Sequence, residues 1–155
     1  MEFGILFDSN QRKFSTEVNH WIVSVTLDNL RIALRERVIG FVESKRSRVK
    51  AFQLGDLIIF YVPRESLAYY KRIGKFIGLA EIKGESYESH TPIWKNGLFP
   101  QRIAIEPLSE RSCEIAPLIE RLGFIKNKRS WGITFLGGIL RIPQTDFETI
   151  RESMK

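Results

Sequence analysis

The stretch HWIVSVT, residues 20–26, determines how the rest of the chain is interpreted. It is apolar and rich in β-branched residues, which is typical of a buried strand. The pattern then changes period, because Leu30, Ala33, Leu34 and Val38 recur at helical spacing. With Asp28 as the expected N-cap, the sequence predicts a strand that leads directly into a helix over residues 29–37.

Further strands and helices follow downstream. The strand patterns are VIGFV (38–42), LGDLIIFYVP (54–63, ended by Pro63), KFIGLAEIKG (75–84) and FPQRIAIEPL (99–108), in which Ile103 and Ile105 alternate with Arg102, Ala104 and Glu106. Helices are expected at 114–123 and after Pro143, where Thr145 would be the cap and Phe147 and Ile150 would face inward. Residues 43–52 and 85–98 are expected to be loops, and Phe60, Tyr61, Phe76 and Phe135 to lie in the core. The sequence thus predicts an α+β domain built on a curved, largely antiparallel sheet that forms a small open barrel.

The first 18 residues differ from this body. Phe3, Ile5 and Phe7 alternate with other residues and predict a short extra strand, whereas residues 8–17 are polar and are expected to be loose. We therefore interpret residues 1–18 as an amino-terminal extension and residues 19–155 as one folded domain.

Composition narrows the class of protein. The chain has 155 residues, and 24 Lys and Arg against 18 Asp and Glu give a net charge of +6, which favours a polyanionic partner. The single Cys113 excludes an internal disulfide and a CxxC-type metal site. No apolar run approaches the roughly 18 residues of a membrane span, and the first residues do not resemble a secretory signal. We expect a cytoplasmic protein that does not enter membranes.

No motif indicates an active site. His20 and His90 are far apart in the sequence, Cys113 has no neighbouring His, and the chain contains no GxSxG, HExxH, P-loop or GxGxxG pattern. Asp56 and Glu81 could meet across strands, but the other acids are scattered. We expect no catalytic residue, no metal ligand and no cofactor.

Basic residues gather in two places. Lys45, Arg46, Arg48 and Lys50 fall in an expected loop, and Lys126, Lys128 and Arg129 lie in GFIKNKRSW (123–131) between Phe124 and Trp131. Trp94 stands beside Lys95 in TPIWKNG, outside any periodic segment. Long cations on loops can reach phosphates, and a semi-exposed indole can stack on a base. The alternatives are solvated charged faces, and a tryptophan packed as a lid over the barrel end.

Five blocks in order resemble the EVE domain, a member of the PUA-like superfamily that is related to YTH, ASCH and SRA-type domains. The blocks are HWIVSVTLDNL (20–30), GDLIIFYVPR (55–64), KFIGLAEI (75–82), FPQRIAIEPL (99–108) and FIKNKRSW (124–131). The resemblance covers about residues 19–155. It implies a PUA-like open β-barrel of about five or six strands, surrounded by helices, that holds a single nucleobase at the barrel mouth without catalysis.

The resemblance also implies particular pocket residues. Ser24 and Thr26, at the end of the first strand, would contact the base edge through their hydroxyls. Ile39 stands where the family commonly has an aromatic wall, with Phe41 on the same face two residues later. This departure leaves the cage incompletely aromatic. Trp94 would form the second wall.

Our leading hypothesis is a non-catalytic domain that accepts one nucleobase, plain or modified, from DNA or RNA. Ser24, Thr26, Ile39, Phe41 and Trp94 would line the pocket. The residues that would hold the nucleic-acid backbone are Lys45, Arg46, Arg48, Lys50, Lys95, Lys126, Lys128 and Arg129. Two alternatives remain: an RNA-processing or defence-associated enzyme on the same fold, and a protein-interaction module that uses the basic face.

Overall fold

The computed structural model describes residues 5–7, 13–15 and 17–155. In the extension, β1 (Ile5–Phe7) pairs antiparallel with β2 (Lys13–Ser15). A strand at residues 5–7 was predicted, but residues 13–15 were expected to be loose and are also extended. The expectations for Phe3, for residues 8–12 and for residue 16 lie outside the described residues.

The body contains strands, helices and 3-10 turns. In chain order these are β3 (His20–Ser24), α1 (Leu27–Glu36), β4 (Val38–Phe41), η1 (Glu43–Lys45), α2 (Arg46–Val49), β5 (Leu57–Arg64), β6 (Arg72–Ile82), β7 (Tyr87–Glu88), β8 (Gln101–Glu114), η2 (Ala116–Arg121), η3 (Trp131–Phe135), β9 (Ile139–Ile142) and α3 (Gln144–Ser153). Within the described residues, no helix has the length and apolar character that crossing a bilayer requires.

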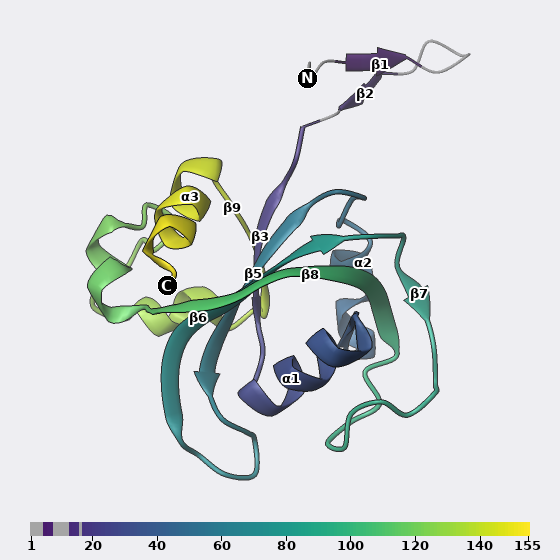
Figure 1. Cartoon of the computed structure of the whole chain (residues 1–155), viewed down its shortest axis with the longest axis horizontal. Coiled ribbons are helices and arrows are strands. Elements are labelled where there is room, and N and C mark those ends of the chain that lie inside the picture. Colours follow the sequence, from purple (N-terminus) through teal and green to yellow (C-terminus); the bar gives the residue numbers. More distant parts are fainter. Residues whose placement is uncertain (1–4, 8–12, 16) are drawn as a thin grey trace.

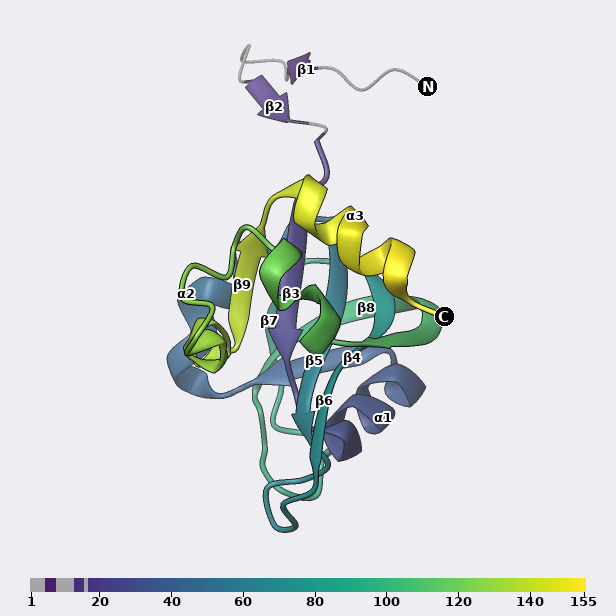
Figure 2. The same ribbon diagram turned by 90° about the vertical axis from the view of Figure 1, so that its left-hand side faces the viewer.

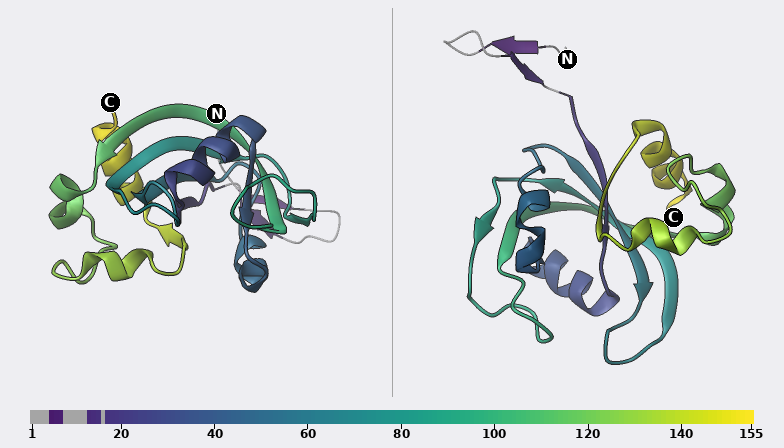
Figure 3. Two further views of the ribbon diagram at one scale, coloured as in Figure 1. Left: turned by 90° about the horizontal axis from the view of Figure 1, so that it is seen from below. Right: turned by 180° about the vertical axis from the view of Figure 1, so that it is seen from behind.

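The strands of the body form one curved sheet in the order β4-β8-β6-β5-β3-β9, and the short β7 pairs with β8. Its neighbouring strands are antiparallel except for β3 and β5, which run parallel. A parallel pair needs a long crossover, which α1, β4 and α2 supply here. Figures 1 and 3 show the long strands β6 and β8 bending over α1. The predicted PUA-like open barrel is confirmed, and β7 and β9 are the strands that the sequence did not reveal.

The central strands are buried on both faces, which explains their unbroken apolar sequences. In β3, Val23 faces the core under α1, whereas Ile22 faces a second core under α3. Phe60 and Tyr61 of β5 divide between the two cores in the same way. Because side chains alternate along a strand, a strand between two cores needs apolar residues at every position. Figure 2 shows α3 and η2 side by side over these strands.

The predicted core aromatics are confirmed. The exposed fractions of Phe60, Tyr61, Phe76 and Phe135 are all below 9 %. Tyr61 stacks on Phe135 with ring centroids 4.2 Å apart. Burial raises the pKa of Tyr61, so its hydroxyl stays protonated at neutral pH.

Both predicted helix caps are wrong by two residues. Helix α1 begins at Leu27, and its N-cap is Thr26, whose hydroxyl accepts a hydrogen bond from the backbone N–H of Asn29 at 3.4 Å. Helix α3 begins at Gln144 directly after Pro143, so that Thr145 lies inside its first turn. Because Pro143 holds the cap position and makes no side-chain hydrogen bond, α3 begins without a polar cap. Phe147 and Ile150 are buried as predicted.

Three other boundaries also differ from the prediction. Strand β5 continues past Pro63 to Arg64, because its pairing with β6 shifts register there and no ladder bond is needed from the proline. Strand β8 runs to Glu114, and the expected helix over 114–123 is the 3-10 turn η2 instead. The expected loop 43–52 contains η1 and α2, held by the buried Val49 and Phe52.

Candidate functional site

A cavity of about 230 Å³ lies on the α1 side of the sheet. It is bounded by the end of β3, the start of α1, strand β4 and the segment around Trp94. Its lining residues are Val23, Ser24, Val25, Thr26, Asn29, Ala33, Ile39, Gly40, Phe41, Val42, Lys45, Phe60, Leu67, Trp94 and Phe99. The structure thus brings together around one cavity all five residues that the sequence assigned to a pocket.

The polar groups of the cavity come from the junction between β3 and α1. The chain leaves β3 after Ser24 and enters α1 through Thr26. The Ser24 hydroxyl donates a long hydrogen bond of 3.5 Å to the Phe135 carbonyl, so its lone pairs can still accept. The Thr26 hydroxyl accepts the capping bond from Asn29, so it can still donate its own proton. The junction therefore offers both an acceptor and a donor.

Trp94 is a fixed wall of the cavity. Of the two interpretations that the sequence left open, a semi-exposed indole and a tryptophan packed as a lid, its burial agrees with the packed one. Its exposed fraction is 7 %, and its Nε1–H donates to the Asn29 carbonyl at 3.2 Å. Its ring meets Phe99 edge-on, with centroids 5.6 Å apart. Close approach to β4 is possible because Gly40 has no side chain: a Cβ atom there would lie 2.6 Å from Cζ3 of Trp94. The indole is thus held from three sides.

Arg102 does not line the cavity but supports the Trp94 wall, and sequence reasoning missed this role. Strand alternation placed it on the solvent side of β8, yet its exposed fraction is 1 %. Its guanidinium lies 5.5 Å from the Trp94 ring and donates to the Ser89 hydroxyl and to the carbonyls of Thr91, Leu98 and Phe99. The carbonyl groups of a long loop without secondary structure need hydrogen-bond donors from elsewhere in the protein, and an arginine side chain offers five N–H donors. An arginine directly after such a loop was therefore the sequence signal for this structural role.

The first basic group lies partly at the cavity. Lys45 is half-buried and contributes to the lining, since η1 follows directly from β4. Arg46 is exposed and lies 3.7 Å from the Glu43 carboxylate, and Lys50 and Lys95 are exposed. Arg48 is used structurally, because its guanidinium donates to the Ile139 carbonyl and ties α2 to β9.

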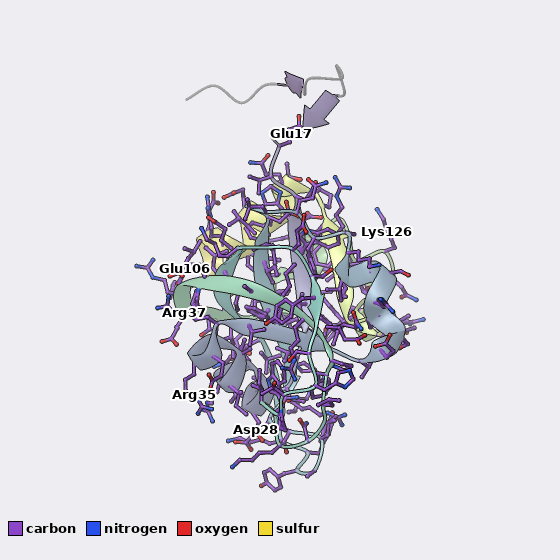
Figure 4. The ribbon with its side chains drawn as sticks, turned by 90° about the vertical axis from the view of Figure 1, so that its right-hand side faces the viewer. Glu17, Asp28, Arg35, Arg37, Glu106 and Lys126 are labelled. Atoms are coloured by element: carbon purple, nitrogen blue, oxygen red, sulfur yellow. The ribbon has the colours of Figure 1, made fainter. Side chains whose placement is uncertain are left out.

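The second basic group lies elsewhere. Phe124 and Trp131 are partly buried and pack on Phe135 in the second core, as the structural part of the prediction required. The Lys128 ammonium donates to two backbone carbonyls of the preceding turn, at 2.9 Å and 2.7 Å. Asp28 marks the position of the cavity, because its sequence neighbours Thr26 and Asn29 line it. Figure 4 shows Lys126 near the opposite end of the molecule from Asp28. The structure therefore does not bring the 126–129 group to the cavity.

The titratable residues considered for catalysis lie outside the cavity. The buried His20 packs on Phe147, and desolvation lowers its pKa. Burial raises the pKa of the Cys113 thiol to about 11, which keeps it protonated. The Asp56 carboxylate accepts from the Trp21 indole N–H at 2.9 Å and from backbone N–H groups, so it has a structural role. Among the described residues that line the cavity, none is Asp, Glu, His or Cys.

Metal binding has no support in the described part of the chain, which contains no cluster of three or more His, Cys, Asp and Glu placed to hold an ion. Glu88 and His90 do form an exposed pair, 3.4 Å apart. Hydrogen bonds from His90 and Gln101 lower the pKa of Glu88. Glu88 ends β7 and His90 lies in the loop that follows, and neither residue lines the cavity.

Comparison with known proteins gives relatives along most of the chain. A UPF0310 protein from Pyrococcus abyssi is 29% identical over 138 residues, which are 86% of this chain and 97% of the relative. A UPF0310 protein from Bacillus licheniformis is 34% identical over 111 residues, covering 71% and 74% of the two chains.

Solved structures share the fold at much lower identity. The YTH domain of the Zygosaccharomyces rouxii MRB1 protein, solved in complex with N6-methyladenosine RNA, superposes with a TM-score of 0.61 at 13% identity and covers 96% and 94% of the two chains. The family model described as the EVE domain matches residues 19–153. With that match, and with the relatives and the curved sheet in agreement, the chain belongs to the EVE domain family.

Proposed function

We propose that this protein binds nucleic acid without catalysing a reaction and accepts one extruded nucleobase in the cavity beside Trp94. The observation that carries the proposal is the cavity itself. It combines a fixed indole wall, a mostly apolar lining, a hydroxyl pair at the β3–α1 junction and Lys45.

The size of the cavity favours a single heterocycle. Pockets for drug-sized ligands have volumes of about 300–1,000 Å³. At about 230 Å³, this cavity has room for a flat ring system but not for a base together with its sugar and phosphate. The remainder of a nucleotide would stay at the mouth, where Lys45 lies.

The energies explain why cations are also needed. Stacking a base on an aromatic side chain contributes roughly 1–3 kcal/mol, and extruding a base from a helix costs a few kcal/mol. The free energy gained by stacking is therefore about equal to the free energy that extrusion of the base costs. Net affinity must come from phosphate contacts, for which the exposed side chains of Arg46, Lys50 and Lys95 are available in addition to Lys45.

A modified base suits the lining better than a plain one. Ile39 and Phe41 replace a full aromatic cage with apolar surface, and each methyl or methylene group buried there contributes about 0.8 kcal/mol. Two structural neighbours are YTH domains solved with N6-methyladenosine RNA and with m6A, and this supports the proposal by analogy of fold.

Calorimetric titration tests the proposal. The ligands are N6-methyladenosine, 5-methylcytidine, their unmethylated nucleosides, and short oligonucleotides that carry each base. We expect a methylated base to bind, and Val42→Phe to weaken its binding at least tenfold by filling the mouth of the cavity. Leu136→Phe is the matched control, because Leu136 is exposed and outside the cavity lining.

Two results would contradict the proposal. One is equal affinity of the wild type and Val42→Phe for every ligand. The other is conversion of an oligonucleotide into product by the purified protein with a divalent metal present, which would favour the enzyme alternative.

A further inference from the structure

The loop between β5 and β6 exposes several large apolar side chains close together. Leu67, Tyr69 and Tyr70 have exposed fractions of 58 %, 65 % and 68 %. Single exposed apolar residues are normal on protein surfaces, but a cluster of them marks an interaction site. Nothing in the cavity described above accounts for the two tyrosines, which do not line it.

This loop is continuous with the cavity. Leu67 belongs to the cavity lining, so the exposed cluster starts at its mouth. The backbone N–H of Asp28 donates to the Glu65 carbonyl at 3.0 Å, which ties the loop to the first turn of α1. Thr26 and Asn29, on either side of Asp28, both line the cavity. The position of the loop relative to the cavity is therefore fixed by the fold.

Internal hydrogen bonds hold the loop in one conformation. The Ser66 hydroxyl accepts from the Tyr69 backbone N–H at 2.8 Å, and the Glu65 backbone N–H donates to the Lys71 carbonyl at 2.9 Å. The Arg64 guanidinium lies over the Tyr70 ring, 5.6 Å from its centroid. A surface held in its binding conformation loses less entropy when a ligand docks.

Basic residues flank the two tyrosines in the sequence. Lys71 and Arg72 are exposed and form no ion pair within the described part of the chain. The segment 64–72 contains three cations, Arg64, Lys71 and Arg72, against one acid, Glu65. Aromatic faces among cations are the combination by which proteins bind single-stranded nucleic acid, with bases stacked on the rings and phosphates near the cations.

We propose that the 65–72 loop is a stacking platform for the nucleotide next to the one in the cavity, and that the ligand is therefore single-stranded. This inference rests on the proposed function. A base inside a duplex has both faces covered by its neighbours, so only an unpaired base can place a free face on Tyr69 or Tyr70. A single strand also presents its bases with little unpairing cost.

Calorimetry with ligands of increasing length separates the two sites. The ligands are a methylated nucleoside that binds in the experiment above, a single-stranded pentanucleotide with the same base at its centre, and that pentanucleotide sequence embedded in a duplex. We expect the pentanucleotide to bind more tightly than the nucleoside and than the duplex. Tyr69→Ala with Tyr70→Ala should weaken pentanucleotide binding about tenfold or more and leave nucleoside binding unchanged.

Two control variants sharpen the test. Replacement of both tyrosines by Phe keeps the stacking faces and should retain pentanucleotide affinity. Tyr87→Ala removes another exposed tyrosine, on β7 and outside the cavity lining, and should have no effect.

The inference is overturned if the double Ala variant binds the pentanucleotide like the wild type, if the Phe variant loses as much affinity as the Ala variant, or if the duplex binds as tightly as the single strand. In each case nucleoside binding, and with it the proposed function, would still stand. If no nucleoside or oligonucleotide binds, both proposals fail together.

Discussion

Two aromatic regions border the same cavity, but they are built in opposite ways. Trp94 is buried, and its cation, Arg102, lies inside the protein with every contact made to the loop that carries the indole. Tyr69 and Tyr70 are exposed. The Arg64 guanidinium lies over the Tyr70 ring, and the neighbouring Lys71 and Arg72 are exposed. The difference teaches that a cation beside an aromatic ring can serve the fold or a ligand, and that burial of the cation decides between them.

The largest effect should come from the buried cation. Arg102→Met leaves the Ser89 hydroxyl and the carbonyls of Thr91, Leu98 and Phe99 without their donor. Since each of these part-buried hydrogen bonds from a charged group contributes about 1.5–3 kcal/mol, we expect the free energy of unfolding to fall by about 3 kcal/mol or more. Urea denaturation measures it.

The matched control for Arg102 is Arg72→Met at the exposed start of β6. It should change the unfolding free energy by no more than about 0.5 kcal/mol. Equal effects of the two substitutions would break the contrast between an internal and an external cation.

A smaller effect is expected at the contact between β4 and the indole. Gly40→Ala places a Cβ 2.6 Å from Trp94 and 2.9 Å from Phe99, so the aromatic pair must move. Overpacking of this kind costs about 1–3 kcal/mol, and methylated-nucleoside affinity should fall as the wall shifts. The control is Gly84→Ala, where an added Cβ meets nothing within 4 Å. Unchanged affinity in Gly40→Ala would show that the Trp94 wall does not contact the ligand.

Next in size is the lysine of the second basic group. The Lys128 ammonium donates hydrogen bonds to the carbonyls of Ile119 and Leu122. Lys128→Ala should lower the free energy of unfolding by about 1 kcal/mol, and with it the melting temperature. Lys126→Ala, at an exposed neighbour, should leave stability unchanged. Equal melting temperatures for the two variants would contradict the structural role of Lys128.

The smallest effect concerns salt dependence. If Lys45 contacts a phosphate, Lys45→Ala should reduce the slope of log affinity against log salt concentration by about 1, and Lys126→Ala should leave the slope unchanged. Fluorescence anisotropy of a labelled pentanucleotide at several salt concentrations measures both slopes. Equal slopes for the two variants would remove Lys45 from the nucleic-acid interface.

The strands were predictable from sequence for a definite reason. β3 and β5 lie between two cores, so every position is apolar and each run stands out. β9 was missed because its four residues, ILRI, follow a 3-10 turn and contain an arginine, so they show neither a long run nor a clear alternation. The helices of 43–52 depend on the burial of Val49 and Phe52, which local patterns do not contain. The α1 cap was missed for another reason: Thr26 and Asp28 are both residue types that cap helices, and the local pattern does not decide between them.

The residues that line the candidate site could be predicted, but the contacts that hold them in place could not. Resemblance to a family placed Ser24, Thr26, Ile39, Phe41 and Trp94 together, and they do line one cavity. The burial of Trp94 could not be inferred, because it depends on Arg102, which strand alternation assigned to solvent. The structural role of Lys128 could not be predicted either, because its hydrogen-bond partners are backbone carbonyls, which are present at every residue of any sequence.

The position of β3 in the sheet has a consequence for how the protein acquires its cavity. Ile22 pairs with Ile59 of β5 on one side and with Leu140 of β9 on the other. Strand β3, which leads into the hydroxyl groups of the cavity, therefore pairs with one strand from the middle of the chain and one from its far end. Structures dominated by such distant pairings fold slowly. During synthesis, an edge of β3 stays open until the last strand arrives, and that edge is where premature association with another chain would begin.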